Sequence, residues 1–186
     1  EPYIIQSDNF DITVAVTDDE INERCQLGDN IGRKEAEDVL ILTKFCNAVL
    51  DGFDGFFFHS SCLELDGEGY AFSAVSGTGK STHAALWRKH FGDRVTMIND
   101  DKPIIRKCDG KFYVYGTPWM GKANIGTNTK VPLKAVYIIE RAKENRAVRV
   151  LPSQVMKQLF EATVIDVERS RMERLLGLFD ECFSVT

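Results

Sequence analysis

The residues most able to do chemistry in this sequence lie in a glycine-rich stretch, residues 74–82, which reads AVSGTGKST. An apolar run precedes the stretch and a segment with helical spacing follows it, so we predict a turn between a strand and a helix. Such a turn points several backbone N–H groups one way at the positive end of a helix dipole, which favours phosphate oxygens. Lys80 adds a mobile positive charge for the β- and γ-phosphates, and the Ser81 hydroxyl is a ligand for Mg²⁺. The stretch therefore predicts a nucleotide-binding loop.

The expected ligands of this loop are ATP and Mg²⁺. The residues that we predict to contact them are Ser76, Gly77, Thr78, Gly79, Lys80, Ser81 and Thr82. The full phosphate-binding (Walker A) pattern is G-x-x-x-x-G-K-[ST], and Ala74 stands where its first glycine would be. Alanine tolerates a positive φ poorly, so the backbone at this one position is left open. The alternative interpretation is a chance glycine-rich turn between two elements.

A histidine precedes the loop on what we predict to be the neighbouring strand. Asp66-Gly67 lies between two apolar runs, which is typical of a two-residue hairpin turn. If these two residues form the turn, counting outward along the strands puts His59 opposite Ala74. His59 is therefore expected beside the mouth of the phosphate site. There it either takes part in the reaction or packs in the hairpin.

Two adjacent carboxylates, Asp100 and Asp101, follow a strand predicted over residues 94–99. In a βαβ unit the two strands run parallel, and their carboxyl ends share one edge of the sheet. Both carboxylates are therefore expected near Lys80 and Ser81. Neighbouring residues at a strand end point to opposite sides, so one carboxylate can face a metal and the other the substrate. The alternative is a pair of solvated turn residues.

Two further groups of residues have weaker signals. Lys122 lies in a loop predicted over residues 116–130, whose glycines would let the lysine swing onto a phosphate. An ordinary surface lysine is the other interpretation. His83, Trp87 and His90 share one side of the helix after the glycine-rich loop. They lack the glutamate of an H-E-x-x-H zinc motif and a third ligand, so we interpret them as packing residues.

The remaining chain mixes strand-like and helical segments. Strands are predicted over residues 3–5, 10–16, 56–65, 70–75, 94–99, 103–107, 111–115, 131–140 and 147–151. Helices are predicted over residues 34–50, 82–91, 152–163 and 169–182, with Ser153 as the N-cap of the third, and residues 17–33 are predicted to be a loop. The hairpin before the glycine-rich loop and the many β-runs after it favour a mixed sheet over the parallel sheet of a generic P-loop hydrolase.

Composition narrows the class of protein. The 186 residues fit one domain, residues 1–186, which can be part of a longer chain because it begins at Glu1 rather than Met. A net charge of −5 without runs of Lys or Arg argues against nucleic acid and membrane partners. Five cysteines without a C-x-x-C pair argue against a disulfide framework or zinc site. With no signal-peptide pattern and no bilayer-length apolar stretch, the expected location is the cytoplasm.

The combination of His59, the SGTGKST loop and the Asp100-Asp101 pair resembles the HPr kinase/phosphorylase and phosphoenolpyruvate carboxykinase superfamily. HPr kinases carry a histidine on the strand before the loop, a G-x-S-G-x-G-K-S loop and an Asp-Asp pair on the next strand. The resemblance covers about residues 56–107. The stretches NDDKP, at residues 99–103, and GTPWMGK, at residues 116–122, look like those of HPr-kinase-related proteins and extend it to about residue 165.

This resemblance implies an α/β fold with a P-loop nucleotide-binding core, a mixed sheet and flanking helices. It implies an ATP- and Mg²⁺-dependent kinase whose acceptor is a hydroxyl group of a protein serine or a small molecule. In that mechanism Lys80 binds the phosphates, Ser81 and Asp100 hold Mg²⁺, and His59 with Asp101 activates the acceptor. We add Lys122 as a residue that reaches the γ-phosphate.

The runner-up hypothesis is a nucleotide-binding regulatory protein that transfers no phosphate. Such a switch needs Lys80 and Ser81 but has no evident need for a base, so the presence of His59 with both aspartates favours the enzyme. The oligomeric state is open, and a homo-oligomer is possible.

Overall fold

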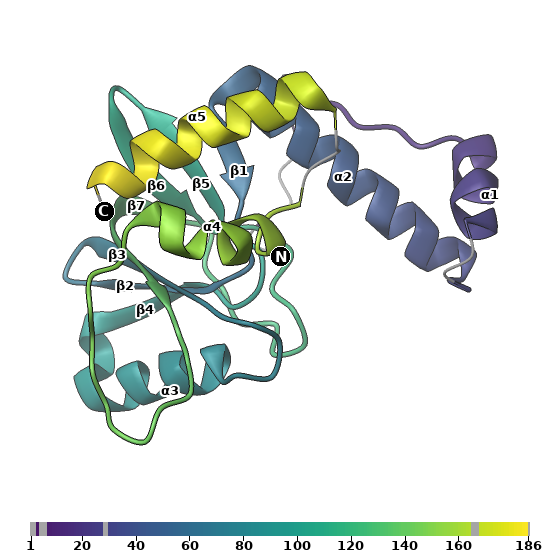
Figure 1. The fold of residues 1–186 in the computed structure, drawn as a ribbon. Coiled ribbons are helices and arrows are strands. Elements are labelled where there is room, and N and C mark those ends of the chain that lie inside the picture. The colour runs from purple at the N-terminus through teal and green to yellow at the C-terminus, as the bar shows by residue number, and fades with distance from the viewer. Residues whose placement is uncertain (1–2, 4–6, 28–29, 165–167, 186) are drawn as a thin grey trace.

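The computed structural model describes residues 3, 7–27, 30–164 and 168–185 (Figure 1). Within them the chain forms an α/β structure, in which a seven-stranded mixed sheet is flanked by helices. The strands are β1 (Gly55–Phe57), β2 (Ser61–Leu65), β3 (Glu68–Ser73), β4 (Val95–Asn99), β5 (Ile104–Cys108), β6 (Lys111–Tyr115) and β7 (Lys130–Ile138). The helices are α1 (Asp18–Gln26), α2 (Arg33–Phe53), α3 (Lys80–Phe91), α4 (Pro152–Glu161) and α5 (Arg169–Val185), with a short 3₁₀ helix at Gly92–Arg94.

The strand order is β1-β5-β6-β7-β3-β2-β4, and the described pairings are antiparallel except for β3 with β7. Because β2 runs antiparallel to both β3 and β4, these two strands are parallel with β2 between them. The carboxyl ends of β3, β4 and β7 therefore meet at one edge of the sheet. The predictions of a mixed sheet and of a shared edge are confirmed.

The hairpin of β2 and β3 has the predicted two-residue turn. Leu65 pairs with Glu68, and Asp66 and Gly67 both have positive φ angles, of 53° and 83°. Positive φ at both central positions is the type I′ geometry, whose twist matches that of the strands. Past the end of this ladder, the hydroxyl of Ser73 donates to the carbonyl of His59 at 3.0 Å. His59 thus lies across from the end of β3, as counting predicted.

The strand predicted over residues 56–65 is divided in two. β1 pairs with β5, whereas β2 pairs with β3 and β4, so the backbone must change partners between them. At the break, Phe58 forms an isolated bridge with Thr163, and the N–H of His59 donates to the carbonyl of Ala162. The residues after α4 therefore supply hydrogen-bond partners to the backbone at the break between β1 and β2. Apolar content alone did not reveal this division.

For the described residues of the N-terminal segment, the predicted secondary structure was wrong. Residues 10–16 form no strand, and their alternation reflects side chains such as Ile12 packing on the cluster around Phe57. The loop predicted over residues 17–33 contains α1, which begins with a capping box between Thr17 and Glu20. Residues 4–5 of the first predicted strand lie outside the described residues, and Tyr3 lies in a turn.

Two C-terminal predictions were also wrong. Residues 147–151 form no strand, because β7 is already paired with β6 on one side and β3 on the other. Ser153 is not the N-cap of α4: that position is Leu151, and Pro152 takes the first helical position, where its missing N–H costs nothing. The remaining helices and the β5–β6 hairpin match their predicted segments within a few residues.

Helices cover both faces of the sheet and hold the edge described above in place (Figure 1). On one face, Leu159 of α4 and Phe179 of α5 join the largest apolar cluster. On the other, Ala84 of α3 packs with Phe72 and Met97. None of the helices in the described residues combines the length and apolar character needed to cross a bilayer.

Three of the five cysteines, Cys46, Cys62 and Cys182, are buried in the core. None of the five, all of which are described, forms a disulfide. Burial raises the pKa of the Cys46 thiol to about 12, and it raises the pKa values of Cys62 and Cys182 as well. These three thiols therefore stay protonated and behave as small apolar side chains.

Candidate functional site

The glycine-rich loop joins the end of β3 to the start of α3, as predicted. Gly77 and Gly79 have φ angles of 78° and 122°, which only glycine adopts without strain. Ala74 is not among the residues with positive φ, so alanine fits at the place of the usual first glycine. The N–H of Thr78 donates to the carbonyl of Val75 at 3.1 Å and closes the turn. The loop thus has its own defined backbone.

The N-terminus of α3 differs from that of a self-contained helix. Its N-cap is Gly79, which supplies no side-chain hydrogen bond, and its first turn contains Lys80 and no acidic residue. By contrast, α1 begins with a capping box and three acidic residues. An uncapped helix start has free N–H donors and a partial positive charge, and a lysine there adds to that charge. Such a helix start favours an anion.

Lys80 itself is partly buried in this position. Burial lowers the pKa of its ammonium group, and the carboxylates of Asp101 and Asp100 act in the opposite direction. Within the described residues it forms no ion pair, and its Nζ contacts the carbonyl of Ala74 at 3.4 Å. Lys80 is therefore a partly desolvated cation within the electrostatic reach of both aspartates.

Asp101 lies between an imidazole and an ammonium group. Its Oδ1 is 3.2 Å from Nε2 of His59, and its Oδ2 accepts a hydrogen bond from Nζ of Lys102. Burial alone would raise the pKa of Asp101, but the hydrogen bonds from His59 and Lys102, with the charge of Lys102, lower it to about 2. Asp101 is thus an ionised acceptor at neutral pH.

The buried side chain of Asn99 holds this arrangement in place. Its Oδ1 accepts from the backbone N–H groups of Asp101 and Lys102, at 2.8 and 2.7 Å. Its Nδ2 donates to the carbonyl and hydroxyl oxygens of Thr117, at 2.9 and 3.1 Å. Asn99 is 0 % exposed, so breaking these bonds would leave polar atoms without partners. The amide therefore couples the turn after β4 to the loop that follows β6.

Asp100 points to a different partner from Asp101. Its Oδ1 accepts a hydrogen bond of 2.6 Å from the hydroxyl of Ser61 on β2. The two adjacent aspartates therefore have different partners: Asp100 is bonded to a hydroxyl, and Asp101 to an imidazole and an ammonium group. Ser81 is exposed in the first turn of α3, at the same edge of the sheet.

Lys122 is exposed, and the residue before it lies against Asp101. The preceding residue, Gly121, has a φ of 65°, and a Cβ built on it would lie 3.0 Å from Cβ of Asp101. The loop around them is tied down on both sides, because Trp119 accepts from the N–H of Lys102 and Thr127 donates to Ile98. The tip of the loop therefore rests against Asp101, and Lys122 is one residue away.

A small pocket opens beside His59. It has a volume of about 210 Å³ and is lined by His59, residues 73–76, and Gln158, Glu161 and Ala162 at the end of α4. It brings the histidine and the start of the glycine-rich loop to one shared space. A compact group that enters this space would touch His59 and the loop together.

His83 of α3 has the packing role that we predicted, whereas the same prediction was wrong for His90, which is exposed in the last turn of this helix. Nε1 of Trp87 donates to Nε2 of His83 at 3.1 Å, and both rings contact Phe72. Burial lowers the pKa of His83, so its ring stays neutral and accepts this hydrogen bond. Among the described residues, no group of three or more His, Cys, Asp or Glu side chains is arranged to hold a metal ion.

Three residues of the site were not found from the sequence: Ser61, Asn99 and Lys102. Serine, asparagine and lysine are common residue types that do not by themselves indicate a site. Their roles here depend on which residues lie next to them in the fold. Asn99 and Lys102 belong to the stretch NDDKP noted above, and Asn99 is also a polar residue at the end of an apolar strand. A buried amide at such a point must bond to the adjacent backbone.

Comparisons with known proteins find few similarities. No protein-family model matches the chain, and no curated protein matches its sequence. Among solved structures, the HPr(Ser) kinase/phosphatase from Coxiella burnetii is similar, with 10 % sequence identity and a TM-score of 0.38. The match covers 66 % of this chain and 86 % of that one. A similarity this low assigns neither a family nor an activity to the chain.

Proposed function

We propose that this protein is a phosphotransferase that binds ATP with Mg²⁺ and transfers the γ-phosphoryl group to a hydroxyl acceptor. One observation carries the proposal: Asp101, whose Oδ1 is 3.2 Å from Nε2 of His59, lies within electrostatic reach of Lys80 at the uncapped start of α3. A phosphate site and a potential base therefore share one edge of the sheet.

The phosphates would bind where positive charge lacks a partner. The free N–H groups at the start of α3 and the ammonium group of Lys80 together offer donors and charge to an anion. Phosphoryl transfer depends on neutralising the charge of the transferred group and on aligning the reactants, more than on covalent help from the protein. Lys80 supplies such charge without competition from an ion pair of its own in the described residues.

The base of the reaction would be Nδ1 of His59. A neutral imidazole has one N–H, and hydrogen bonding to the ionised Asp101 places that N–H on Nε2. Nδ1 then has the lone pair that can accept the proton of a hydroxyl. With a pKa of about 2, Asp101 is too weak a base for this task at neutral pH, and it would instead orient the ring and stabilise the imidazolium.

The residues present fit Mg²⁺ better than a metal that needs a protein cage. Mg²⁺ keeps several waters and is usually held by one or two carboxylates together with substrate phosphates. Asp100 offers one carboxylate, already oriented by Ser61, and Ser81 offers a hydroxyl beside Lys80. We assign Asp100 and Ser81 to this role. When bound, the ion would supply further neutralisation of phosphate charge.

The acceptor would enter the pocket beside His59. At about 210 Å³ this pocket takes a narrow group, such as the side chain of a serine on an exposed peptide or a small hydroxylated molecule. Lys122 follows Gly121, the loop residue that lies against Asp101, and it would approach the phosphates on closure of the loop.

The first test of this function is nucleotide binding. Lys80→Ala should weaken binding of ATP with Mg²⁺ by about tenfold to a hundredfold, since a charge-assisted contact contributes about 1.5–3 kcal/mol. Isothermal titration calorimetry measures this, with Lys89→Ala as a control, because Lys89 is an exposed cation in the last turn of the same helix. Unchanged affinity in a folded Lys80→Ala protein would refute the phosphate site.

The second test is transfer itself. Purified protein with γ-labelled ATP should label an acceptor in a metabolite pool or a cell lysate, and the Lys80→Ala protein should not. A protein that binds ATP tightly but labels neither pool would instead be a nucleotide-dependent switch.

A further inference from the structure

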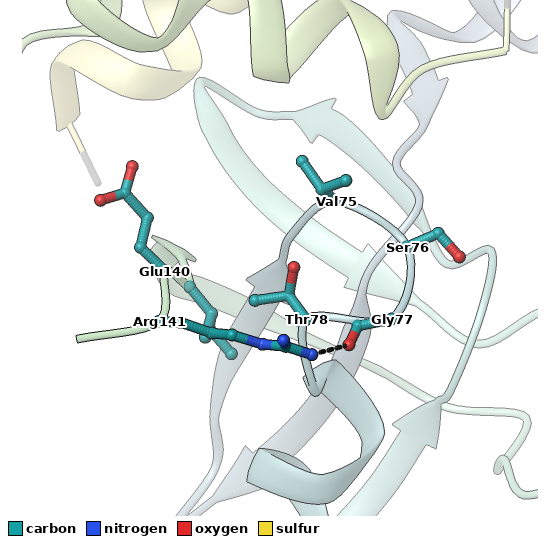
Figure 2. Close-up of a pocket in the computed structure, with 7 residues that line it drawn as sticks. Val75, Ser76, Gly77, Thr78, Glu140 and Arg141 are labelled. Atoms are coloured by element: carbon teal, nitrogen blue, oxygen red, sulfur yellow. Dashed lines mark hydrogen bonds between the residues drawn. The ribbon is translucent and has the colours of Figure 1, made fainter. Parts of the chain in front are cut away.

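A second and larger pocket lies on the other side of the glycine-rich loop. It has a volume of about 420 Å³ and is lined by Val75, Ser76, Gly77 and Thr78 of the loop and by residues 139–141, which follow β7 (Figure 2). This volume is within the range of about 300–1,000 Å³ that is usual for small-molecule sites. The phosphotransferase mechanism described above uses none of the residues after β7.

The position of this pocket follows from the strand order. β3, which enters the loop, has β2 and then β4 on one side and β7 on the other. The His59–Asp101 pair is therefore on one flank of the loop, and residues 139–141 are on the opposite flank. The N–H of Ile139 donates to the carbonyl of Ser73 at 2.8 Å, which fixes this segment beside the start of the loop. A long ligand whose reacting end faced Asp101 would extend its other end over this pocket.

The chemistry of the pocket fits a flat, uncharged group. Val75 is 67 % exposed, which leaves a large apolar side chain uncovered at the tip of the loop. The guanidinium of Arg141 is held against the loop by a hydrogen bond of 2.8 Å from Nη2 to the carbonyl of Gly77, and Figure 2 shows it lying beside Thr78. Glu140, the preceding residue, adds a carboxylate to the lining, which makes the pocket a poor site for further phosphate.

We propose that this pocket binds the nucleoside half of a nucleoside triphosphate, with the base against Val75 and the guanidinium of Arg141. A planar guanidinium stacks on an aromatic base, and an aliphatic wall excludes water from such a base. The inference rests on the proposed function, because the phosphates must occupy the loop for the base to reach this flank. It adds a recognition site that distinguishes a nucleotide from a bare polyphosphate.

The test compares ATP with inorganic tripolyphosphate, each with Mg²⁺, by isothermal titration calorimetry. The wild-type protein should bind ATP more tightly than tripolyphosphate. Arg141→Ala should weaken ATP binding by about fivefold, the usual effect of an exposed cation–π contact, and leave tripolyphosphate binding unchanged. Lys143→Ala is the matched control, because Lys143 is an exposed cation two residues further on, and it should affect neither ligand.

Photo-crosslinking with 8-azido-ATP is a second measurement that needs no variant. The label should appear on peptides that contain Val75 or Arg141, and ATP should compete for it whereas tripolyphosphate should compete less. Labelling confined to α4 would overturn the inference.

The remaining outcomes separate the two proposals. Equal affinity of the wild-type protein for ATP and tripolyphosphate would overturn the nucleoside pocket but leave the phosphate site intact. An equal loss of both ligands in Arg141→Ala would show that the arginine only shapes the loop, which also overturns it. If the wild-type protein binds neither ligand, both the pocket and the proposed function fail.

Discussion

At the scale of single residues, the site depends on how Asp101 is kept ionised while partly buried. Burial would favour its protonated form, and two hydrogen bonds reverse that preference. The same bonds fix the ring of His59 and the ammonium group of Lys102, so the carboxylate organises its neighbours. Lys102 was absent from the sequence prediction of this site, although it is the next residue in the chain.

The pKa of Asp101 predicts how stability changes in acid. Because the folded pKa, about 2, is below its ordinary value of 3.8, the contribution is present above about pH 4 and is lost as the pH falls towards 2. Asp101→Asn removes this titration, so the variant should lose less stability than the wild-type protein over that interval. Urea unfolding between pH 2 and pH 6 measures the difference. Asp109→Asn, in the exposed turn between β5 and β6, is the control, and a parallel pH profile for Asp101→Asn and wild type would contradict the assignment.

His59 gives a second prediction at this scale. His59→Ala should lower the rate of phosphoryl transfer by about 10²–10⁴-fold, the usual contribution of a positioned base. Binding of ATP should change little, because the imidazole is not among the groups that would hold phosphate. Single-turnover transfer with an identified acceptor measures the rate, and His90→Ala on the exposed side of α3 is the control. A wild-type rate in folded His59→Ala protein would reduce the histidine to a packing role.

At the scale of elements, the loop between β6 and β7 has both anchored and exposed parts. Thr117 is buried and bonded to Asn99, and residues 126–129 are tied to the end of β4 and to Gly116. Residues 121–125 between these anchors are largely exposed, and they include Lys122. The sequence predicted one flexible loop over residues 116–130, whereas the anchors confine any closure to this tip.

Hydrogen exchange tests that division. With a non-hydrolysable ATP analogue and Mg²⁺, exchange should slow in residues 121–125, because a closing tip would order them over the phosphates. Exchange at the anchored Thr117 should change much less. The turn at Asp109-Gly110, at the far end of the β5–β6 hairpin, is the control. Equal exchange at the tip with and without the analogue would rule out closure.

At the scale of the whole molecule, helices from both ends of the chain hold the sheet that positions the site. Phe179 of α5 is 0 % exposed and contacts Phe56 of β1 and Phe160 of α4. It therefore links the last helix to the first strand. Leu176, on the same helix, is 40 % exposed and lies outside this cluster.

This difference predicts a stability effect. Phe179→Ala should lower the free energy of unfolding by about 3–5 kcal/mol, through lost burial and the cavity that remains. Leu176→Ala should lower the free energy of unfolding by less, because this side chain is partly exposed and lies outside the buried cluster. Guanidinium unfolding of both variants provides the measurement. Equal losses would contradict the division between a core position at Phe179 and a peripheral position at Leu176.

Several features were determined by the sequence itself, because they depend on neighbours in the chain. The Asp66-Gly67 turn set the register of β2 and β3 and so placed His59 across from the end of β3. The run of glycines before Lys80 specified a strand-to-helix turn, since two positions require positive φ. The apolar strand before Asp100 placed both carboxylates at the same edge. Such local rules are sufficient wherever short-range geometry decides the outcome.

The tertiary structure alone decided which side chains meet. Asp101 with His59, and Asp100 with Ser61, are pairs more than 35 residues apart, and their partners depend on β2 lying between β3 and β4. The absence of a strand at residues 147–151 has the same cause, because β7 has no free edge. The pocket beside Arg141 exists only because β7 ends next to the loop. Strand order is set by the packing of the complete core, and no window of sequence contains that information.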